Sequence, residues 1–245
     1  MAKYQMQAST ASSRLGVAWH VLVPALQILV YGLIFGLVLG ANRPARFLPY
    51  LIVGVVLFQF ISGAFADGAK SITSNASLVR SLNFPRVLLP SSSVMANVYK
   101  IVPLIGLMLI GLVVMGEPIT WSWLLIIPVL ALITLFGLGL AMISARLTVS
   151  FADLGQMIPF LTRVAFYASG VFFDIEKLLH GTGALLLVFA SNPIHIYLKL
   201  ARAALVTGYE ASALDWMLAG AWSIAILVAG FIFFWRAEAR YGRNV

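Results

Sequence analysis

The sequence of 245 residues contains no cysteine and few charged side chains. Without cysteine, the chain has no disulfides, no thiolate metal ligands and no cysteine nucleophile. Charged residues make up 10% of the chain and hydrophobic residues 62%, whereas soluble domains average about 25% charged. A compact soluble fold of this length cannot cover so much apolar surface with polar groups. The composition therefore excludes a soluble enzyme, a nucleic-acid-binding protein and a disordered chain, and it predicts a membrane protein.

Long apolar stretches recur along the chain. A helix needs about 20 apolar residues to cross the ~30 Å hydrocarbon core of a bilayer, and six stretches approach or reach that length. We expect an all-α membrane protein with six transmembrane helices in one domain, residues 1–245. The expected spans are 21–40, 48–66, 93–115, 124–144, 156–175 and 215–235.

Two connections between these spans are longer than turns. Residues 67–92 join the second and third spans, and residues 174–215 join the fifth and sixth. The second connection contains an apolar run, 183–190, which is too short to cross a bilayer and is typical of a re-entrant or interfacial helix. A further short helix is expected after Asn192, because Pro193 suits a first helical turn.

Lysine and arginine predict how the chain is oriented, because cytoplasmic loops carry an excess of both. With the N-terminus inside, the inner side collects eleven basic and three acidic residues, and the outer side collects five of each. The net charge of +8 then lies on one face. We expect a multi-pass protein of the bacterial plasma membrane with both termini in the cytoplasm.

Charge is expected to be absent from the interiors of the spans. A charged side chain at the bilayer centre costs at least about 2.5–3.5 kcal/mol, and we expect every titratable group to lie at a span end or in a connection. Ion-coupled carriers need such intramembrane groups, so the pattern favours a transporter driven from outside its own membrane helices. His20, His180 and His195 are scattered without metal-ligand spacing, so we expect no metal site and no catalytic residues.

Aromatic residues share helix faces in three expected spans, in pairs that are four or seven residues apart. Most rings in a membrane protein contact lipid or the protein core. The alternative hypothesis is that some rings line a substrate channel and stack on sugar faces. The candidate channel rings are Tyr31, Phe35, Phe58, Phe65, Phe160 and Tyr167.

Four motifs, in order along the chain, resemble those of one family, the membrane subunits of ABC-type polysaccharide exporters of the O-antigen and teichoic-acid kind. Leu-Gly-x-x-Trp-x-x-x-x-Pro is similar to the family's entry into its first helix, and Ser-Asn-x-x-Leu-Val-Arg leading to Phe-Pro-Arg is similar to its first cytoplasmic loop. An Asp-Leu-x-Gln connection and an Asn-Pro helix start complete the resemblance. The four motifs lie at 15–24, 74–86 with 89–90, 146–156, and 191–193 with 200–202.

The resemblance implies a half-transporter. Two copies of the chain, a homodimer, would form the membrane channel, and two nucleotide-binding ATPase subunits would dock from the cytoplasm. ATP and Mg would be bound by those partners, so this chain is expected to be no enzyme and to hold no cofactor. The expected cargo is a lipid-linked polysaccharide, moved out of the cytoplasm across the inner membrane. Membrane lipids are expected as further partners, and nucleic acid is not.

The resemblance also implies roles for individual residues. Lys100 and Arg146 are candidates for binding the pyrophosphate headgroup of the substrate or ordinary lipid phosphates, and both alternatives stay open. Arg80 and Arg86 have a simpler alternative role as inner-face charges or as contacts to anionic lipid headgroups. The outer gate is expected to include Asn192, Pro193 and Arg202. The candidate ATPase-coupling residues are Arg80, Leu82, Asn83, Phe84, Pro85, Arg86, Asp153 and Gln156.

Two other functions remain as alternatives to polysaccharide export. The nearer one is an ABC exporter of smaller lipids or drugs, and the more distant one is a membrane enzyme of lipid-linked sugars. The Ala/Gly-rich, cysteine-free composition is typical of a high-GC bacterium. Within the family, it favours a polymer of the mycobacterial galactan type.

Overall fold

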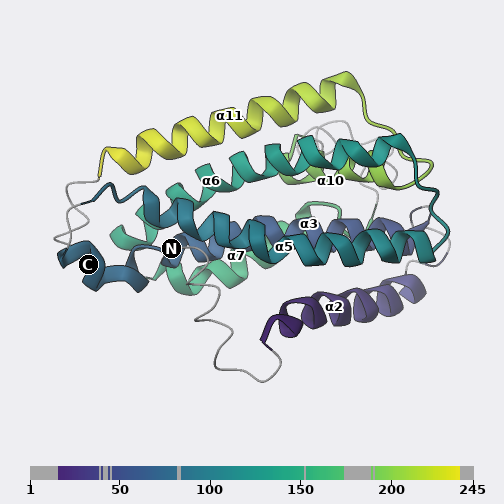
Figure 1. Cartoon of the computed structure of the whole chain (residues 1–245), viewed down its shortest axis with the longest axis horizontal. Helices are drawn as coiled ribbons and strands as arrows, with labels where there is room; N and C mark the ends of the chain where they lie inside the picture. The colour runs from purple at the N-terminus through teal and green to yellow at the C-terminus, as the bar shows by residue number, and fades with distance from the viewer. Residues whose placement is uncertain are drawn as a thin grey trace.

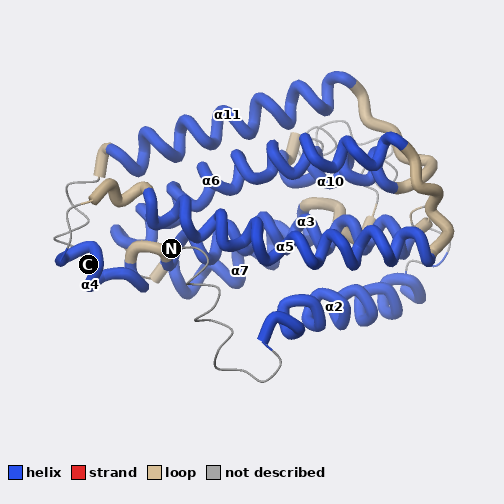
Figure 2. The backbone as a smooth tube through the Cα atoms, in the orientation of Figure 1, coloured by secondary structure: helices blue, strands red, loops and turns tan. Residues whose placement is uncertain are grey.

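The structure is a computed structural model that describes residues 16–38, 40, 44, 46–81, 84–151, 153–173, 189 and 191–237. Across these residues the chain forms helices and loops without strands (Figure 2), which confirms the expected all-α class. The helices are α2 (Gly16–Val38), α3 (Phe47–Lys70), α4 (Ala76–Ser81), α5 (Leu88–Val114), α6 (Ile126–Ser150), α7 (Leu154–Ala168), α10 (Pro193–Leu205) and α11 (Ala213–Trp235), with 3-10 turns η2 (Thr73–Asn75) and η3 (Trp121–Leu125).

Four of these helices are long and apolar enough to cross a membrane. They are α3, α5, η3 with α6, and α11, and their most apolar windows have mean hydropathies of 2.0 to 2.6. They coincide with the spans expected at 48–66, 93–115, 124–144 and 215–235. Helix α7, at 15 residues, is shorter than a full span. The apolar run 183–190, expected to form a re-entrant helix, lies outside the described residues.

Helix α3 is the centre of the bundle. It packs against α2, α5, α6, α7 and α10, and most of its length is buried inside the protein. The long helices run side by side along the longest axis of the molecule (Figure 1). Helices α2, α5 and α11 expose large apolar side chains such as Leu37, Val114 and Met217. Such outward-facing side chains suit contact with lipid.

Glycines allow three of the helix pairs to approach each other closely. A Cβ atom at Gly139 of α6 would lie 2.6 Å from Leu227 N of α11, and one at Gly230 of α11 would lie 2.9 Å from the Cα of Gly139. A Cβ atom at Gly68 of α3 would lie 2.5 Å from the Cα of Ala141. These distances leave no room for a side chain, so backbone packs on backbone, as small residues permit in membranes. In α2, Gly32 faces Leu48 of α3, which is packing within the chain.

The two ends of the bundle differ in their elements and their charges. At one end lie α4, the start of α5, the end of α6, the start of α7 and the end of α11 (Figure 1); we name it the α4 end. At the other end lie α10 and the starts of α3, η3 and α11; we name it the α10 end. Among the described residues, the last turns and loops of the α4 end carry mainly basic residues: Lys70, Arg80, Arg86, Arg146 and Arg236.

Two charged residues lie inside helices that overlap expected spans, although the span interiors were expected to be free of charge. Lys100 lies midway along α5, and Arg163 lies in the second half of α7. Hydropathy averages over a window, so one charged residue within a strongly apolar stretch does not lower the average enough to be noticed. The charge of Lys100 is offset by Asp67 of α3, 3.2 Å away, which no property of the sequence around Lys100 predicts.

Candidate functional site

The first candidate coupling segment lies at the α4 end. Its ring, Phe84, is half-buried and packs against an apolar cluster of the chain itself, whereas Arg80 and Pro85 are exposed. Arg86 is half-buried, and Leu82 and Asn83 lie outside the described residues. The predicted apolar anchor is therefore partly used to hold this segment onto the bundle. The buried members of the cluster are Ile72, Val79, Leu89, Met142, Ala145, Phe234 and Ala237.

The second candidate coupling segment lies at the start of α7. Asp153 and Gln156 are both exposed, and the backbone N–H of Gln156 donates to Asp153 O at 3.0 Å. Val149, near the end of α6, packs on the same apolar cluster as Phe84. The two coupling segments thus lie at the same end of the bundle, and the end of α6, which precedes the second segment, packs on the same small core as the first.

Aromatic rings from α2, α3 and α7 gather where these helices meet the turn after α7. Phe35 stacks on Phe172 with ring centroids 4.2 Å apart, and Tyr31 meets Phe172 edge-on at 5.0 Å. Phe166 lies between helices, 4.8 Å from Phe58 and 5.6 Å from Tyr31. Tyr167 joins the group at its exposed side, 5.8 Å from Phe172.

Four of the six candidate channel rings are therefore brought together: Tyr31, Phe35, Phe58 and Tyr167. Phe65 shares a helix face with Phe58 but lies about 10 Å further along the axis, since seven residues are two helical turns. Phe160 is exposed on the outside of α7. Sequence reasoning missed Phe166 and Phe172, which join the other rings to one another. Phe166 could have been suspected because it is adjacent to Tyr167 in the sequence. Phe172 lies in a turn, where no helical periodicity predicts its position.

A cavity of about 320 Å³ lies beside these rings, between α2, α3 and α7. Its polar side chains are unusual for a bundle this apolar. The residues that line it are Gln27, Tyr31, Val55, Phe58, Gln59, Ser62, Pro159, Thr162, Arg163 and Phe166.

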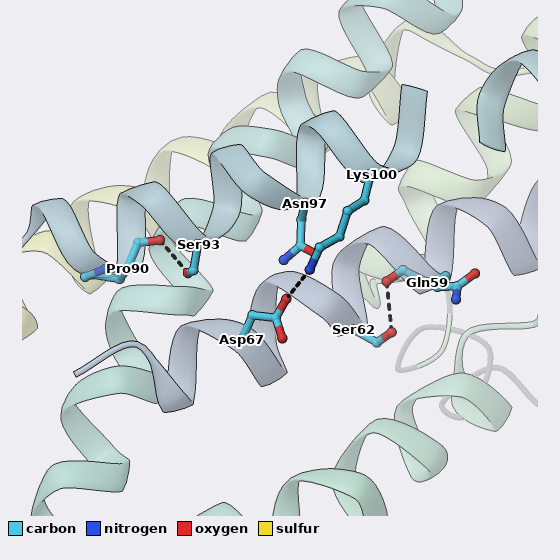
Figure 3. A network of polar contacts seen from close by, with 7 residues as sticks. All are labelled: Gln59, Ser62, Asp67, Pro90, Ser93, Asn97 and Lys100. Carbon is cyan, nitrogen blue, oxygen red and sulfur yellow. Dashed lines mark hydrogen bonds and ion pairs between the residues drawn. The ribbon is translucent and has the colours of Figure 1, made fainter. Parts of the chain in front are cut away.

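A second, smaller polar region lies between α3 and α5 (Figure 3). Lys100 Nζ lies 3.2 Å from Asp67 Oδ2 and donates to Asn97 Oδ1 at 3.5 Å. Asn97 is buried, and its Nδ2 has no partner among the described residues. Gln59 lines both this region and the cavity at α2 and α7. Lys100 is thus engaged by a carboxylate, which neutralises its charge.

Arg146, the other candidate headgroup residue, is directed at α11. Its guanidinium lies 3.8 Å from the ring centroid of Phe233, and its Nη1 donates to Phe233 O. A cation over an aromatic face is stabilised by the ring's quadrupole. Arg146 therefore contributes to packing between α6 and α11, on the side of α6 that faces away from the aromatic cavity.

The candidate outer-gate residues Asn192 and Pro193 form the start of α10. Asn192 Oδ1 accepts from Ile194 N at 3.0 Å, which caps the helix, and Pro193 occupies the first turn. The amide of Asn192 also donates to Ala168 O at 3.2 Å, at the end of α7. The cap thereby joins the start of α10 to the end of α7.

Arg202 is a buried cation that joins α10 to α3. Its guanidinium lies 3.4 Å from the ring centroid of Tyr50, and it donates to the carbonyl oxygens of Tyr50 and Val171 at 3.4 and 3.3 Å. Only 2% of Arg202 is exposed. A Cβ atom at Gly54 would lie 2.6 Å from Arg202 Nη2, so the missing side chain makes room for the guanidinium. The structure therefore places this residue in the packing of the α10 end.

Three loops of the α10 end are joined by Glu117, whose side chain is fully buried. Its Oε1 lies 2.9 Å from Arg46 Nη1, and its Oε2 accepts from Thr207 N and Thr207 Oγ1, both at 3.0 Å. No sequence pattern predicts this network, because its members lie far apart along the chain.

Comparison with known proteins identifies the family. The family model described as "ABC-2 type transporter" matches residues 1–206, most of the chain. The chain belongs to the ABC-2 type transporter family. One curated relative, the "O-antigen export system permease protein RfbA" of Myxococcus xanthus, is 30% identical over 237 residues, which cover 96% of this chain and 87% of the relative. A protein of the same name from Klebsiella pneumoniae is 28% identical over 168 residues, 68% of this chain and 64% of the relative.

Membership of the ABC-2 family indicates a multi-pass membrane protein with a role in transport, powered by ATP in a separate subunit. The four long apolar helices agree with this assignment. Within the described residues, no group of three or more His, Cys, Asp or Glu is placed to hold a metal ion.

Proposed function

We propose that this chain is the membrane subunit of an ATP-driven exporter that moves a lipid-linked polysaccharide from the cytoplasm across the bacterial inner membrane. The observation that carries the proposal is the match to O-antigen export permeases, which in one relative extends over 96% of this chain. The aromatic cavity between α2, α3 and α7 supports it, since rings beside polar groups suit sugars, which have apolar faces and polar edges.

The proposed topology has six spans. Helix α2, with 23 residues, is about 34 Å long and suits a full span. Helix α7, with 15 residues, would be a shorter fifth span. With both added to the four long apolar helices, the chain crosses an even number of times and both termini lie on one side. The charges support placing the α4 end in the cytoplasm, because it carries the basic excess. At the α10 end the described basic residues, Arg46, Lys199 and Arg202, are equal in number to the acidic ones, Glu117, Glu210 and Asp215.

The α4 end is the proposed docking surface for two ATPase subunits, which would bind ATP and Mg. Arg80 and Pro85 are exposed there, beside the half-buried Phe84 and Arg86, and Asp153 and Gln156 are exposed nearby. Leu82 and Asn83 belong to the same proposed surface. A half-buried ring with charged neighbours is typical of the core and rim of an interface. Two copies of the chain would then form the channel as a homodimer.

The gate and the channel are proposed at the aromatic cluster and α10. The rings Tyr31, Phe35, Phe58 and Tyr167 would border the sugar path, with Phe65 and Phe160 as its more distant members. Asn192, Pro193 and Arg202 would hold the gate helix α10 in place, through the contacts to α7 and α3. Export of smaller lipids or drugs is the alternative cargo; a galactan-type polymer remains one candidate among the polysaccharides.

The experiment that tests the function is polymer export in a defined strain. The gene would be deleted, and surface polysaccharide measured by immunoblot with and without the chain and its ATPase partner. We expect lipid-linked polymer to accumulate inside the cell and to return to the surface on complementation. Unchanged surface polymer, together with loss of efflux of a small lipid or drug, would favour the alternative cargo.

A charge reversal tests the docking surface. Arg80→Glu changes an exposed side chain, whereas Phe84→Asp would also disturb the apolar cluster. We expect Arg80→Glu to weaken co-purification of the ATPase, and Glu210→Lys, an exposed reversal at the α10 end, to leave it intact. Equal recovery of the ATPase with both variants would place the docking surface elsewhere.

A further inference from the structure

The cavity between α2, α3 and α7 contains a charged residue that the proposed function does not yet use. Arg163 lines it from the second half of α7, as an exposed residue of that helix. In the proposed topology α7 is a span, and a charged residue on a membrane helix is costly to retain and marks a candidate functional site. Arg163 was not among the headgroup candidates, because the sequence shows it only as one more basic residue counted on the inner side.

Arg163 has no carboxylate partner among the described residues. Asp67 is paired with Lys100, Glu117 with Arg46 and Asp215 with Lys199. Asp153 lies on the same helix but about 15 Å away along its axis, since the two are ten residues apart. Within the described part of the chain, Arg163 is therefore not paired with a carboxylate, in contrast to Lys100.

The guanidinium suits one chemical class of ligand in particular. It presents parallel N–H donors that match the oxygens of a phosphate, and it keeps its charge at any physiological pH. Arg146 carries the same group but is engaged with the ring and carbonyl of Phe233. Of Lys100, Arg146 and Arg163, only Arg163 lines a cavity without a carboxylate partner among the described residues.

Gln59, on the α3 wall of the same cavity, indicates a second property of the ligand. Its Oε1 is buried and has no hydrogen-bond partner among the described residues. A buried acceptor without a donor is destabilising, so a hydroxyl or N–H group of a ligand bound in this cavity would stabilise it. The doubly esterified phosphates of a lipid-linked sugar diphosphate are fully ionised at neutral pH and bear no such donor, whereas the sugar bears several hydroxyls.

The aromatic wall completes the site. Tyr31, Phe58 and Phe166 line the cavity from three helices, with neighbouring centroids 4.8 to 5.6 Å apart. A volume of about 320 Å³ lies at the lower end of the range for small-ligand pockets, about 300–1,000 Å³. The cavity therefore has room for a phosphate and an adjoining sugar and not for a long stretch of polymer.

We infer that the cavity between α2, α3 and α7 binds the junction between phosphate and first sugar of a lipid-linked glycan, with Arg163 on the phosphate and Gln59 on a sugar hydroxyl. This inference rests on the proposed function and assigns the site at which the substrate is recognised. It predicts that Arg163 and Gln59 contact different parts of one ligand.

Binding to the purified full-length chain tests the inference. The detergent is octaethylene glycol monododecyl ether, which contains no sugar, and the titrations use calorimetry. The probes are farnesyl diphosphate N-acetylglucosamine, farnesyl diphosphate, farnesol, inorganic pyrophosphate and phosphatidylglycerol. We expect Arg163→Gln to weaken both farnesyl diphosphates about ten- to a hundredfold, as loss of a charged hydrogen bond does, and to leave farnesol unchanged. Gln59→Leu should weaken only the glycosylated probe.

Matched variants separate recognition from folding. Arg163→Lys keeps the charge and should retain most of the affinity, and Arg146→Gln removes an arginine engaged elsewhere and should bind both diphosphates like the wild type. Equal affinity of wild type and Arg163→Gln for the diphosphates would overturn the inference. The inference would also be overturned if Arg163→Gln weakened phosphatidylglycerol binding as much as diphosphate binding, because the site would then bind any lipid phosphate. Tight binding of inorganic pyrophosphate without a lipid would overturn it too, because the site would then bind a free anion.

The binding assay and the export assay together distinguish failure of this inference from failure of the proposed function. If Arg163→Gln binds and exports like the wild type, the inference fails and the proposed function stands. If the wild-type chain binds the glycosylated probe but its deletion leaves surface polysaccharide unchanged, the proposed function fails while the site remains.

Discussion

The crossing of α6 and α11 makes a sharp prediction about stability. A Cβ atom at Gly139 would lie 2.6 Å from Leu227 N and 2.5 Å from Ile226 C. Non-bonded carbon atoms are most stable about 3.5–4.0 Å apart, so Gly139→Ala requires the helices to separate by about 1 Å. Such a gap forfeits about a quarter to a half of the dispersion energy of the atoms facing it. Overpacking of this kind costs about 1–3 kcal/mol.

Gly220→Ala, on α11, is the matched control, since nothing lies within 4 Å of a Cβ atom there. Both substitutions gain the same helix propensity, about 1 kcal/mol, so the difference between the two variants isolates the steric effect. For a chain of this size, 1 kcal/mol shifts the Tm by about 2–4 °C. We expect Gly139→Ala to unfold several degrees below Gly220→Ala when heated in detergent micelles.

The pair Gly139 and Gly230 provides an internal test of the same reasoning. Both face the same crossing, so once one alanine has separated the helices the second should cost less, and the double variant should be less destabilised than the sum of the singles. Equal Tm values for Gly139→Ala and Gly220→Ala would refute the close approach of α6 and α11.

Three further predictions concern polar groups that are buried or half-buried, and each is measured as a Tm in micelles. Arg202→Gln should destabilise the chain by about 2–4 kcal/mol, because the stacking on Tyr50 and two carbonyl hydrogen bonds are lost; a wild-type Tm would contradict this packing. Glu117→Gln should cost about 1–3 kcal/mol, less than a fully buried pair because its arginine partner is 45% exposed in its side chain, and Glu117→Asp serves as its control. Lys100→Met should be more destabilising than the double variant Asp67→Asn/Lys100→Met, since only the single leaves a carboxylate unpaired; the reverse order would show that the two do not interact.

The positions of the long helices could be predicted from the sequence wherever a long apolar run marks the helix. Four spans coincide with long apolar helices, and the Asn-Pro start of α10 was predicted from proline's fixed backbone angle and missing N–H. The position of Arg163 inside α7 was not noticed, because its neighbours are mostly apolar. The pairing of Lys100 with Asp67 was not predicted, because the partner comes from another helix.

The candidate site was predicted in part. Helical periodicity placed Tyr31 with Phe35 and gave several rings of the aromatic cluster, since residues four apart share a face. It could not supply Phe172, which lies in a turn, or the cavity, which exists only where three helices meet. Nor could periodicity show that Arg202 lies buried over Tyr50, because the space for it is created by Gly54 on a different helix.

Helix α7 touches both the proposed docking surface and the proposed gate. It starts directly after Asp153, and at its other end the last carbonyl, that of Ala168, accepts from the amide of Asn192. If an ATPase subunit docks near Asp153 as proposed, a tilt of α7 would displace the first turn of α10 for as long as this hydrogen bond is kept. The same tilt would move Arg163, which lies between the two ends of α7.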